Sequence, residues 1–296
     1  MMSTTQTTTV LEGGYIRLDD KLYENGDLRA YFGQTVDVIS TANEIPTVMA
    51  NDDRRLTLSP IFVTTALKTA RNITLAAANN SRNKMGLILG DSGNGKTVAT
   101  YYLAYTIPSC IRLCAWDGIS PLVLLKTLLK KLQPEEGISR GTSQDVMTQL
   151  LPQVWGRIFV IDETNHLSRH HFEKLRNLVD EGCCTIIFVG TSLMLQSFEN
   201  PRYSIYLEQA HRRIGGRQIY LNGALSVEIL QEKLSMFFDP KSLNKPILEA
   251  FRKYNWGHLD EVIQQSLRRM EKLNQNLTIA LIKAAAKETR AEVIKV

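Results

Sequence analysis

The residues with the clearest chemical potential are a glycine-rich loop and the lysine within it. An apolar run, 85–89, leads into Gly90-Asp91-Ser92-Gly93-Asn94-Gly95-Lys96-Thr97-Val98, where a helical pattern begins. The glycines let successive backbone N–H groups surround a polyphosphate, and the helix adds its positive end. In such a loop the lysine reaches the β- and γ-phosphates and the next hydroxyl ligates Mg²⁺. We therefore expect this loop to bind ATP, with Thr97 on Mg²⁺; the alternative is a glycine-rich turn without a ligand.

Two acidic residues follow another apolar run. Residues 158–161 are wholly apolar, and Asp162 and Glu163 come directly after them. At the carboxyl end of a buried strand, Asp162 is placed to hold Mg²⁺ through its water shell. Glu163 is placed to polarise the water that attacks the γ-phosphorus. The pair therefore indicates hydrolysis, and the alternative is that two acids merely end a strand at the surface.

Thr191 and Ser192 end the next apolar run, 185–190. Carboxyl ends of parallel strands meet at one sheet edge, so these hydroxyls are expected beside Lys96 and Glu163. Thr191 is the better candidate to hold the attacking water or to sense the γ-phosphate. The alternative is a hydroxyl that only ends a strand.

These residues need a scaffold, and the chain alternates between strand and helix patterns. The strands are apolar without alternation, which predicts an α/β fold with a parallel sheet covered on both faces. Helices are expected between them, and beyond Leu221 the patterns are only helical. The expected strands are 85–89, 110–116, 157–163 and 185–192, and the expected C-terminal helices are 226–237, 243–254, 258–273 and 278–291. The predicted domains are 58–222 for the nucleotide-binding core and 223–296 for an all-helical lid.

The N-terminal residues 1–57 are predicted to be a tail and a docking arm. Residues 1–14 are polar and rich in threonine, so we expect disorder there. Residues 15–57 show no sustained hydrophobic periodicity and are too few for an independent core. The chain has no signal-like N-terminus and no apolar run long enough to span a bilayer, which predicts a cytoplasmic protein without a membrane partner.

Charge is distributed unevenly along the chain. Residues 1–57 hold nine acidic and five basic residues, 58–225 hold twelve and eighteen, and 226–296 hold nine and twelve. The basic excess on the nucleotide domain and the C-terminal part suits a polyanionic partner.

The order of these motifs resembles a known family. A phosphate loop, Asp162-Glu163, a polar strand end, the segment His211-Arg212-Arg213-Ile214-Gly215-Gly216-Arg217 and a helical lid together resemble an AAA+ ATPase over residues 59–290. Within it, the arginine-glycine segment and the chain size look most like the MuB/TnsC transposition regulators, with IstB/DnaC-like loaders next. The resemblance implies that Arg213 acts as an arginine finger on a neighbouring subunit's nucleotide. Arg212 or Arg217 could take that role, and the alternative is a solvated basic loop.

One position departs from the family pattern. Many AAA+ lids carry an arginine three residues after a helix-opening glycine, and here Gly257 is followed at that spacing by Asp260. A carboxylate cannot contact a γ-phosphate favourably, so coupling between lid and hydrolysis is in doubt. Arg268 and Arg269 lie further along and are poor substitutes.

Basic residues after the second strand are the DNA-binding candidates. Lys126 and Lys130 are spaced i, i+4 on one helix face, Lys131 is adjacent, and Arg140 lies in the next loop. The resemblance implies contacts to the duplex backbone from the inner face of an oligomer, which need no base reading. The alternative is a solvated lysine face.

The resemblance implies an ATP-hydrolysing, DNA-binding protein that forms a homo-oligomer, as a ring or helical filament, on double-stranded DNA. It would select target DNA and activate or recruit a transposase. A helicase loader shares the fold and chemistry but would act at single-stranded DNA. A signalling NTPase would use the loop as a nucleotide switch, and a small-molecule kinase would leave Glu163 and Arg213 without a role.

Overall fold

The computed structural model describes residues 3–18, 21–41, 46–49, 55–57, 59–135, 141–194 and 204–289. The contacts divide the chain into two units. The first comprises residues 1–63 together with 232–238, and the second comprises 64–231 together with 239–296.

The first unit is built from short antiparallel strands. One sheet has the order β1-β4-β5-β6 and the other β2-β3-β7. The elements are β1 (Ser3–Thr9), β2 (Tyr15–Leu18), β3 (Lys21–Glu24), η1 (Gly26–Tyr31), β4 (Thr35–Thr41), β5 (Thr47–Met49), β6 (Arg55–Thr57) and β7 (Ser59–Pro60). Apolar side chains from these elements, and Val10 directly after β1, form a buried cluster of Val10, Ile16, Leu18, Leu28, Val36, Val38 and Val48.

Over the described residues 3–14 this unit overturns the expectation of disorder, and it also overturns the expectation of an arm without a core. The threonine-rich segment forms β1, which pairs with β4 over its whole length, from Ser3↔Thr41 to Thr9↔Thr35. Threonine is β-branched and favours extended backbone, so a polar threonine run supplies strand propensity even where it supplies little apolar surface. Low hydrophobicity alone therefore gave the wrong prediction.

The second unit contains the predicted parallel sheet. Its five strands have the order β12-β8-β11-β10-β9, and every neighbouring pair is parallel. Their bounds are β8 (Met85–Gly90), β9 (Cys110–Cys114), β10 (Ile158–Asp162), β11 (Thr185–Gly190) and β12 (Gln218–Leu221). All residues of β8, β10 and β11 are buried, which is why these strands read as unbroken apolar runs. The predicted α/β fold is confirmed.

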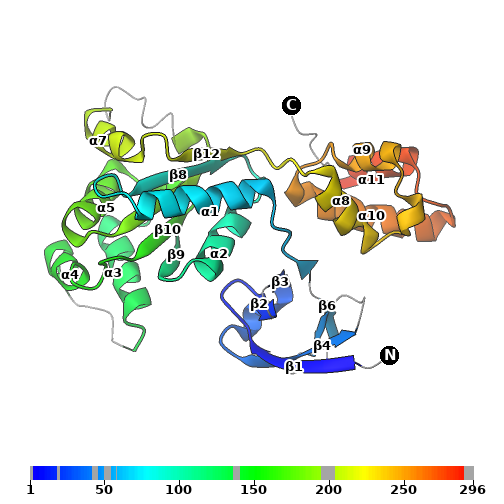
Figure 1. The fold of residues 1–296 in the computed structure, drawn as a ribbon, viewed down its shortest axis with the longest axis horizontal. Coiled ribbons are helices and arrows are strands. Elements are labelled where there is room, and N and C mark those ends of the chain that lie inside the picture. Colours follow the sequence, from blue (N-terminus) through cyan, green and yellow to red (C-terminus); the bar gives the residue numbers. More distant parts are fainter. Residues whose placement is uncertain are drawn as a thin grey trace. The chain divides into compact units, whose positions relative to one another are not determined.

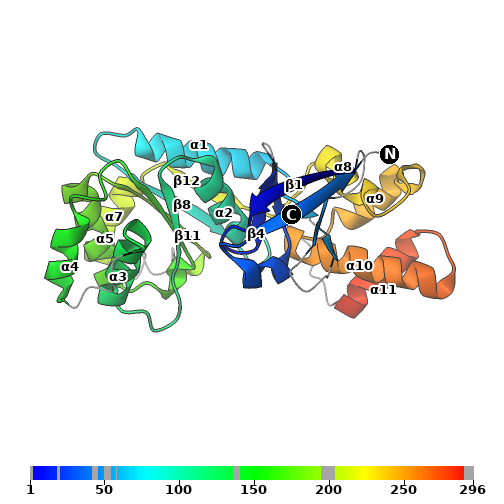
Figure 2. The same ribbon diagram turned by 90° about the horizontal axis from the view of Figure 1, so that it is seen from below.

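Helices cover both faces of this sheet (Figures 1 and 2). One face carries α1 (Thr65–Ala78) and α2 (Lys96–Thr106), and the other carries α3 (Pro121–Leu132), α4 (Ser143–Leu150), α5 (Arg169–Gly182) and α7 (Ser204–Ile214). Local sequence sets the starts of these helices. Ser120 caps α3 ahead of Pro121, and Thr142 and Asp145 form a capping box on α4.

The predicted helical C-terminal region is also present. It contains α8 (Val227–Ser235), η3 (Pro240–Ser242), α9 (Lys245–Phe251), α10 (Trp256–Leu273) and α11 (Ile279–Thr289). Asn244 and Asn255 cap α9 and α10 through their side-chain oxygens. Over the described part of the chain, no helix combines the length and the apolar character that crossing a bilayer requires.

Candidate functional site

The glycine-rich loop joins β8 to α2 in the geometry that a phosphate needs. Gly93 and Gly95 have φ of 77° and 81°, a left-handed backbone conformation that residues with a Cβ rarely adopt. Gly95 is the N-cap of α2 and provides no side-chain cap, so the amides of the first turn, which includes Thr97 and Val98, have no capping side chain. This open end of α2 suits an anion.

Lys96 is buried within the loop beside three carboxylates. Its Nζ donates a 2.8 Å hydrogen bond to the Asp91 carbonyl oxygen, and the side chain is 7% exposed. Burial lowers the pKa of Lys96, and the carboxylates of Glu163, Asp162 and Asp91 oppose this effect. The ammonium thus lies in the loop itself, with donor capacity for a phosphate.

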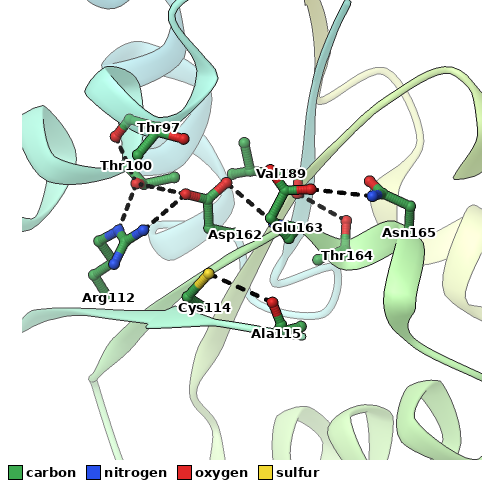
Figure 3. Close-up of polar contacts among 10 residues, drawn as sticks. All are labelled: Thr97, Thr100, Arg112, Cys114, Ala115, Asp162, Glu163, Thr164, Asn165 and Val189. Atoms are coloured by element: carbon green, nitrogen blue, oxygen red, sulfur yellow. Dashed lines mark hydrogen bonds and ion pairs between the residues drawn. The ribbon is translucent and has the colours of Figure 1, made fainter. Parts of the chain in front are cut away.

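Asp162 ends β10 almost completely buried, and both of its oxygens accept hydrogen bonds (Figure 3). Oδ1 accepts from the Glu163 backbone N–H at 3.0 Å. Oδ2 accepts from Arg112 Nη2 at 2.8 Å and from Thr100 Oγ1 at 3.4 Å. Thr100 lies on α2, one turn after Lys96, so this carboxylate joins β10 to the helix that follows the loop.

Glu163 is linked to the end of the neighbouring strand through the side-chain amide of Asn165, and Figure 3 shows the contact between Glu163 and Asn165. Its backbone has a φ of 54°, which is uncommon for a residue with a side chain. Its Oε2 accepts a 3.1 Å hydrogen bond from Asn165 Nδ2. Asn165 Oδ1 in turn accepts from the Thr191 backbone N–H at 3.1 Å. The predicted base and the predicted polar strand end are therefore tied together by Asn165.

These residues fit an ATP–Mg²⁺ complex. The hydroxyl oxygen of Thr191 is buried without a hydrogen-bond partner at this edge of the sheet, and Thr97 is exposed at the start of α2. Within the described residues, no group of three or more His, Cys, Asp or Glu side chains is placed to hold a metal ion. Mg²⁺ binds proteins through one or two side chains plus substrate phosphates, and Thr97 and Asp162 are the side chains that would serve here.

Within the described residues, the C-terminal helices contact the phosphate loop without an arginine. The backbone N–H of Gly257 donates to the Gly93 carbonyl oxygen at 2.9 Å, and Asn255 Nδ2 donates to the Ser92 carbonyl oxygen at 3.4 Å. Asp260, at the position where the family pattern has arginine, is exposed. Arg269 pairs with Glu288 of α11. The loop is thus touched by the N-terminal end of α10, mainly through backbone atoms.

The arginines before β12 lie in three different settings. Arg213 makes a bidentate ion pair with Asp180 of α5, at 2.9 and 2.8 Å. Arg212 is 77% exposed and pairs with Glu208 one turn earlier. Arg217 donates to the carbonyl oxygens of Met85 and Arg213, at 3.1 and 2.6 Å, and so acts within the fold.

Arg212 and Arg213 also line a cleft of about 480 Å³, together with Ser81, Arg82, Asn83, Lys84, Val179, Asp180 and Cys183. Lys84 immediately precedes β8, and Cys183 lies two residues before β11. The cleft is therefore at the amino ends of the strands, whereas the phosphate loop is at their carboxyl ends.

The DNA-binding candidates lie apart from these groups. Lys126 and Lys130 are both on α3, the first half-buried and the second exposed, and Lys131 beside them is exposed. Arg140 lies outside the described residues.

Sequence reasoning missed Arg112, Thr100, Asn165 and Asn255. Arg112 carried a signal, because a charged residue inside a buried strand needs a partner. The other three are small polar residues whose partners lie on other elements, and local patterns do not reveal such pairings.

Comparison with known proteins agrees with this geometry. Residues 79–197, from the segment before the phosphate loop to beyond Thr191, match a family model described as AAA domain. Two solved structures have similar folds. The Aeropyrum pernix ORC1 protein in complex with DNA has a TM-score of 0.51 and 14% identity over 76% of this chain and 64% of that one. Drosophila ORC bound to DNA has a TM-score of 0.50 and 12% identity over 77% and 62%.

The chain spans less than two thirds of the length of both proteins. No curated protein sequence matches it. Residues 79–197 thus resemble an AAA domain, and the two solved structures share the fold of this chain. Neither comparison identifies the MuB/TnsC group.

Gly257→Ala tests the contact between α10 and the loop. A Cβ at position 257 would lie 2.9 Å from the Gly93 Cα, so it has to push the helix from the loop. Alanine is otherwise better than glycine inside a helix by about 1 kcal/mol. We expect the thermal unfolding midpoint to fall in Gly257→Ala and to rise slightly in the control Gln264→Ala, which changes an exposed residue of the same helix. A higher midpoint in Gly257→Ala would contradict the contact.

Proposed function

We propose that this protein is an ATP-dependent, DNA-binding ATPase of the AAA+ type that assembles into a ring or helical filament on double-stranded DNA. The observation that carries the proposal is the hydrogen-bonded group at the carboxyl edge of the sheet. There Lys96 begins α2 and lies within electrostatic reach of Asp162 and Glu163 at the end of β10. Thr100 of α2 contacts Asp162, and Asn165 links Glu163 to the backbone of Thr191.

In this proposal each side chain has a distinct task in hydrolysis. Lys96 and the free amides at the start of α2 bind the phosphates, and bound Mg²⁺ would neutralise their charge. Glu163 accepts the proton of the attacking water, and the unpartnered Thr191 hydroxyl positions that water or the γ-phosphate. A small-molecule kinase leaves Glu163 without this task.

Assembly is supported by the position of the cationic cleft. A subunit cannot bring the arginines at the amino ends of its strands to its own phosphate loop at the carboxyl ends. They can reach a nucleotide only on another subunit, where a guanidinium neutralises charge that develops on the γ-phosphoryl oxygens. The cleft adds Arg82 and Lys84 to Arg212 and Arg213, which suits a polyphosphate.

The two candidate arginine fingers differ in the ion pair that each would have to break to reach a nucleotide. Arg213 is 25% exposed and is held by both oxygens of Asp180, so an action in trans requires exchange of that partner. Arg212 is far more exposed, and its pair with Glu208 is an exposed i, i+4 pair, a type that contributes about 0.3–0.5 kcal/mol. We retain Arg213 as the proposed finger and Arg212 as its alternative.

Duplex DNA as partner is supported by the basic excess of the core and by the α3 lysines, which add cationic groups without base-reading geometry. The transposase as partner, and the choice of target DNA, rest on the resemblance of the arginine-glycine segment to MuB/TnsC regulators. A helicase loader would differ by preferring single-stranded DNA.

The first prediction separates binding from hydrolysis. Lys96→Ala should lose ATP binding, because the ammonium is the loop's only side-chain cation. Glu163→Gln should bind ATP with wild-type affinity and turn it over at least tenfold more slowly. Equilibrium binding of a fluorescent ATP analogue and steady-state phosphate release measure the two effects. Wild-type turnover in Glu163→Gln would remove the proposed base.

The second prediction concerns action across a subunit boundary. Lys96→Ala and Arg213→Ala should each be inactive alone, and a mixture should recover part of the activity, because one subunit supplies the nucleotide and the other the arginine. A second mixture, of Lys96→Ala with Arg212→Ala, tests the alternative finger in the same way. No recovery in either mixture, at concentrations where the subunits co-assemble, would contradict a finger in trans.

The third prediction concerns DNA. Binding should require ATP, rise cooperatively with protein concentration and weaken steeply with salt, since each neutralised phosphate releases condensed counterions. Replacing Lys126 and Lys130 together by alanine should flatten the dependence of log affinity on log salt by up to about 1.8. Lys283 and Lys287, exposed with the same spacing on α11, are the matched control. An unchanged slope would place the DNA contacts elsewhere.

A further inference from the structure

Arg112 is a cation built into the interior of the nucleotide core. It lies at the centre of β9, and its side chain is 8% exposed. Charged side chains are almost never this buried without a partner. Its Nη2 donates to Asp162 Oδ2 at 2.8 Å and its Nε donates to Thr100 Oγ1 at 2.7 Å (Figure 3). The guanidinium carbon also lies 4.1 Å from the centre of the Tyr101 ring.

The carboxylate it contacts is the one expected to serve Mg²⁺. Asp162 is 1% exposed, and an ionised carboxylate this buried is costly unless it is paired. Its Oδ1 accepts from a neutral backbone N–H, and its Oδ2 accepts from Arg112 and weakly from Thr100. Among these donors Arg112 alone supplies positive charge.

We propose that Arg112 is a positioning residue of the metal site: it is the counter-cation of Asp162 when Mg²⁺ is absent, and it competes with Mg²⁺ for that carboxylate when nucleotide binds. The proposal rests on the ATPase function proposed above. Arg112 does not contact ATP in this proposal. Because Arg112 opposes the metal at Asp162, Mg²⁺ binds there only together with the phosphates of the nucleotide.

The surroundings of Arg112 allow such an exchange. Thr100 and Tyr101 both belong to α2, and they contact the guanidinium in addition to Asp162. If Asp162 engages a metal ion, Arg112 keeps a hydrogen bond and an aromatic face and does not become an unpartnered buried charge. The two cations would then lie near one carboxylate and repel each other, so Arg112 should weaken the binding of Mg²⁺.

The test is Arg112→Gln, which removes the charge. Mg²⁺ is titrated against a fixed concentration of a fluorescent ATP analogue, and thermal unfolding is measured in Mg²⁺-free buffer. We expect the half-saturating Mg²⁺ concentration to fall at least threefold below wild type. The midpoint in Mg²⁺-free buffer should also fall, and Mg²⁺ with nucleotide should raise it by more than in wild type.

Arg176→Gln is the matched control, because Arg176 is a half-buried arginine on α5 that is paired with Asp180 and Gln209. It should leave the half-saturating Mg²⁺ concentration unchanged. If Arg112→Gln does not fold, the double variant Arg112→Gln/Asp162→Asn should fold, since the uncompensated carboxylate is gone.

An unchanged or higher half-saturating concentration in folded Arg112→Gln overturns the competition, and a double variant that remains unfolded overturns the counter-charge role. Wild-type protein that binds no ATP analogue at any Mg²⁺ concentration overturns the proposed function as well. Wild-type binding with an identical titration in Arg112→Gln overturns this inference alone.

Discussion

A carboxylate buried at the end of a parallel strand must be given donors, and the arrangement of the nucleotide core follows from that constraint. The Asp162 side chain is held by the β9 arginine and by Thr100 of α2. These contacts fix β10 to the neighbouring strand and to the helix that begins with Lys96. The position of the lysine relative to the acidic pair is therefore set by buried polar contacts, in addition to apolar packing.

The same edge of the sheet shows how the catalytic candidates are connected. Glu163 leaves β10 in a left-handed backbone conformation, and Asn165 links its carboxylate to the backbone of Thr191. Gly190, which precedes Thr191, leaves room for this arrangement, because a Cβ there would lie 2.7 Å from Thr164 Oγ1 and 2.9 Å from Asn165 Oδ1. A structural change at the end of β11 would thus be transmitted to Glu163 through the Asn165 side chain.

The sequence predicted the parts of this structure that depend on local pattern. Unbroken apolar runs identified the buried strands, and the glycine spacing identified the loop, because both reflect backbone geometry within a few residues. The first unit was missed, because its core is assembled from single residues such as Leu28 and Val36 on separate short elements. Asn165 and Asn255 were missed for a related reason, since their partners Thr191 and Ser92 are distant in the sequence.

Asp260 illustrates the limit of reasoning by resemblance. Its position left the coupling between the lid and hydrolysis in doubt, and the structure shows that the C-terminal helices contact the loop through the Gly257 N–H and the Asn255 amide. Backbone contacts of this kind leave almost no signature in side-chain identity, apart from the absence of a Cβ at Gly257.

The central claim is that the nucleotide site is completed by a second copy of the chain. Electron microscopy of the protein with a non-hydrolysable ATP analogue, Mg²⁺ and duplex DNA tests it most directly. We expect a ring or helical filament around the duplex, in which Arg212 or Arg213 of one subunit reaches the phosphates bound at Lys96 of the next. Single subunits bound to nucleotide and DNA, with both arginines remote from any phosphate, would contradict it.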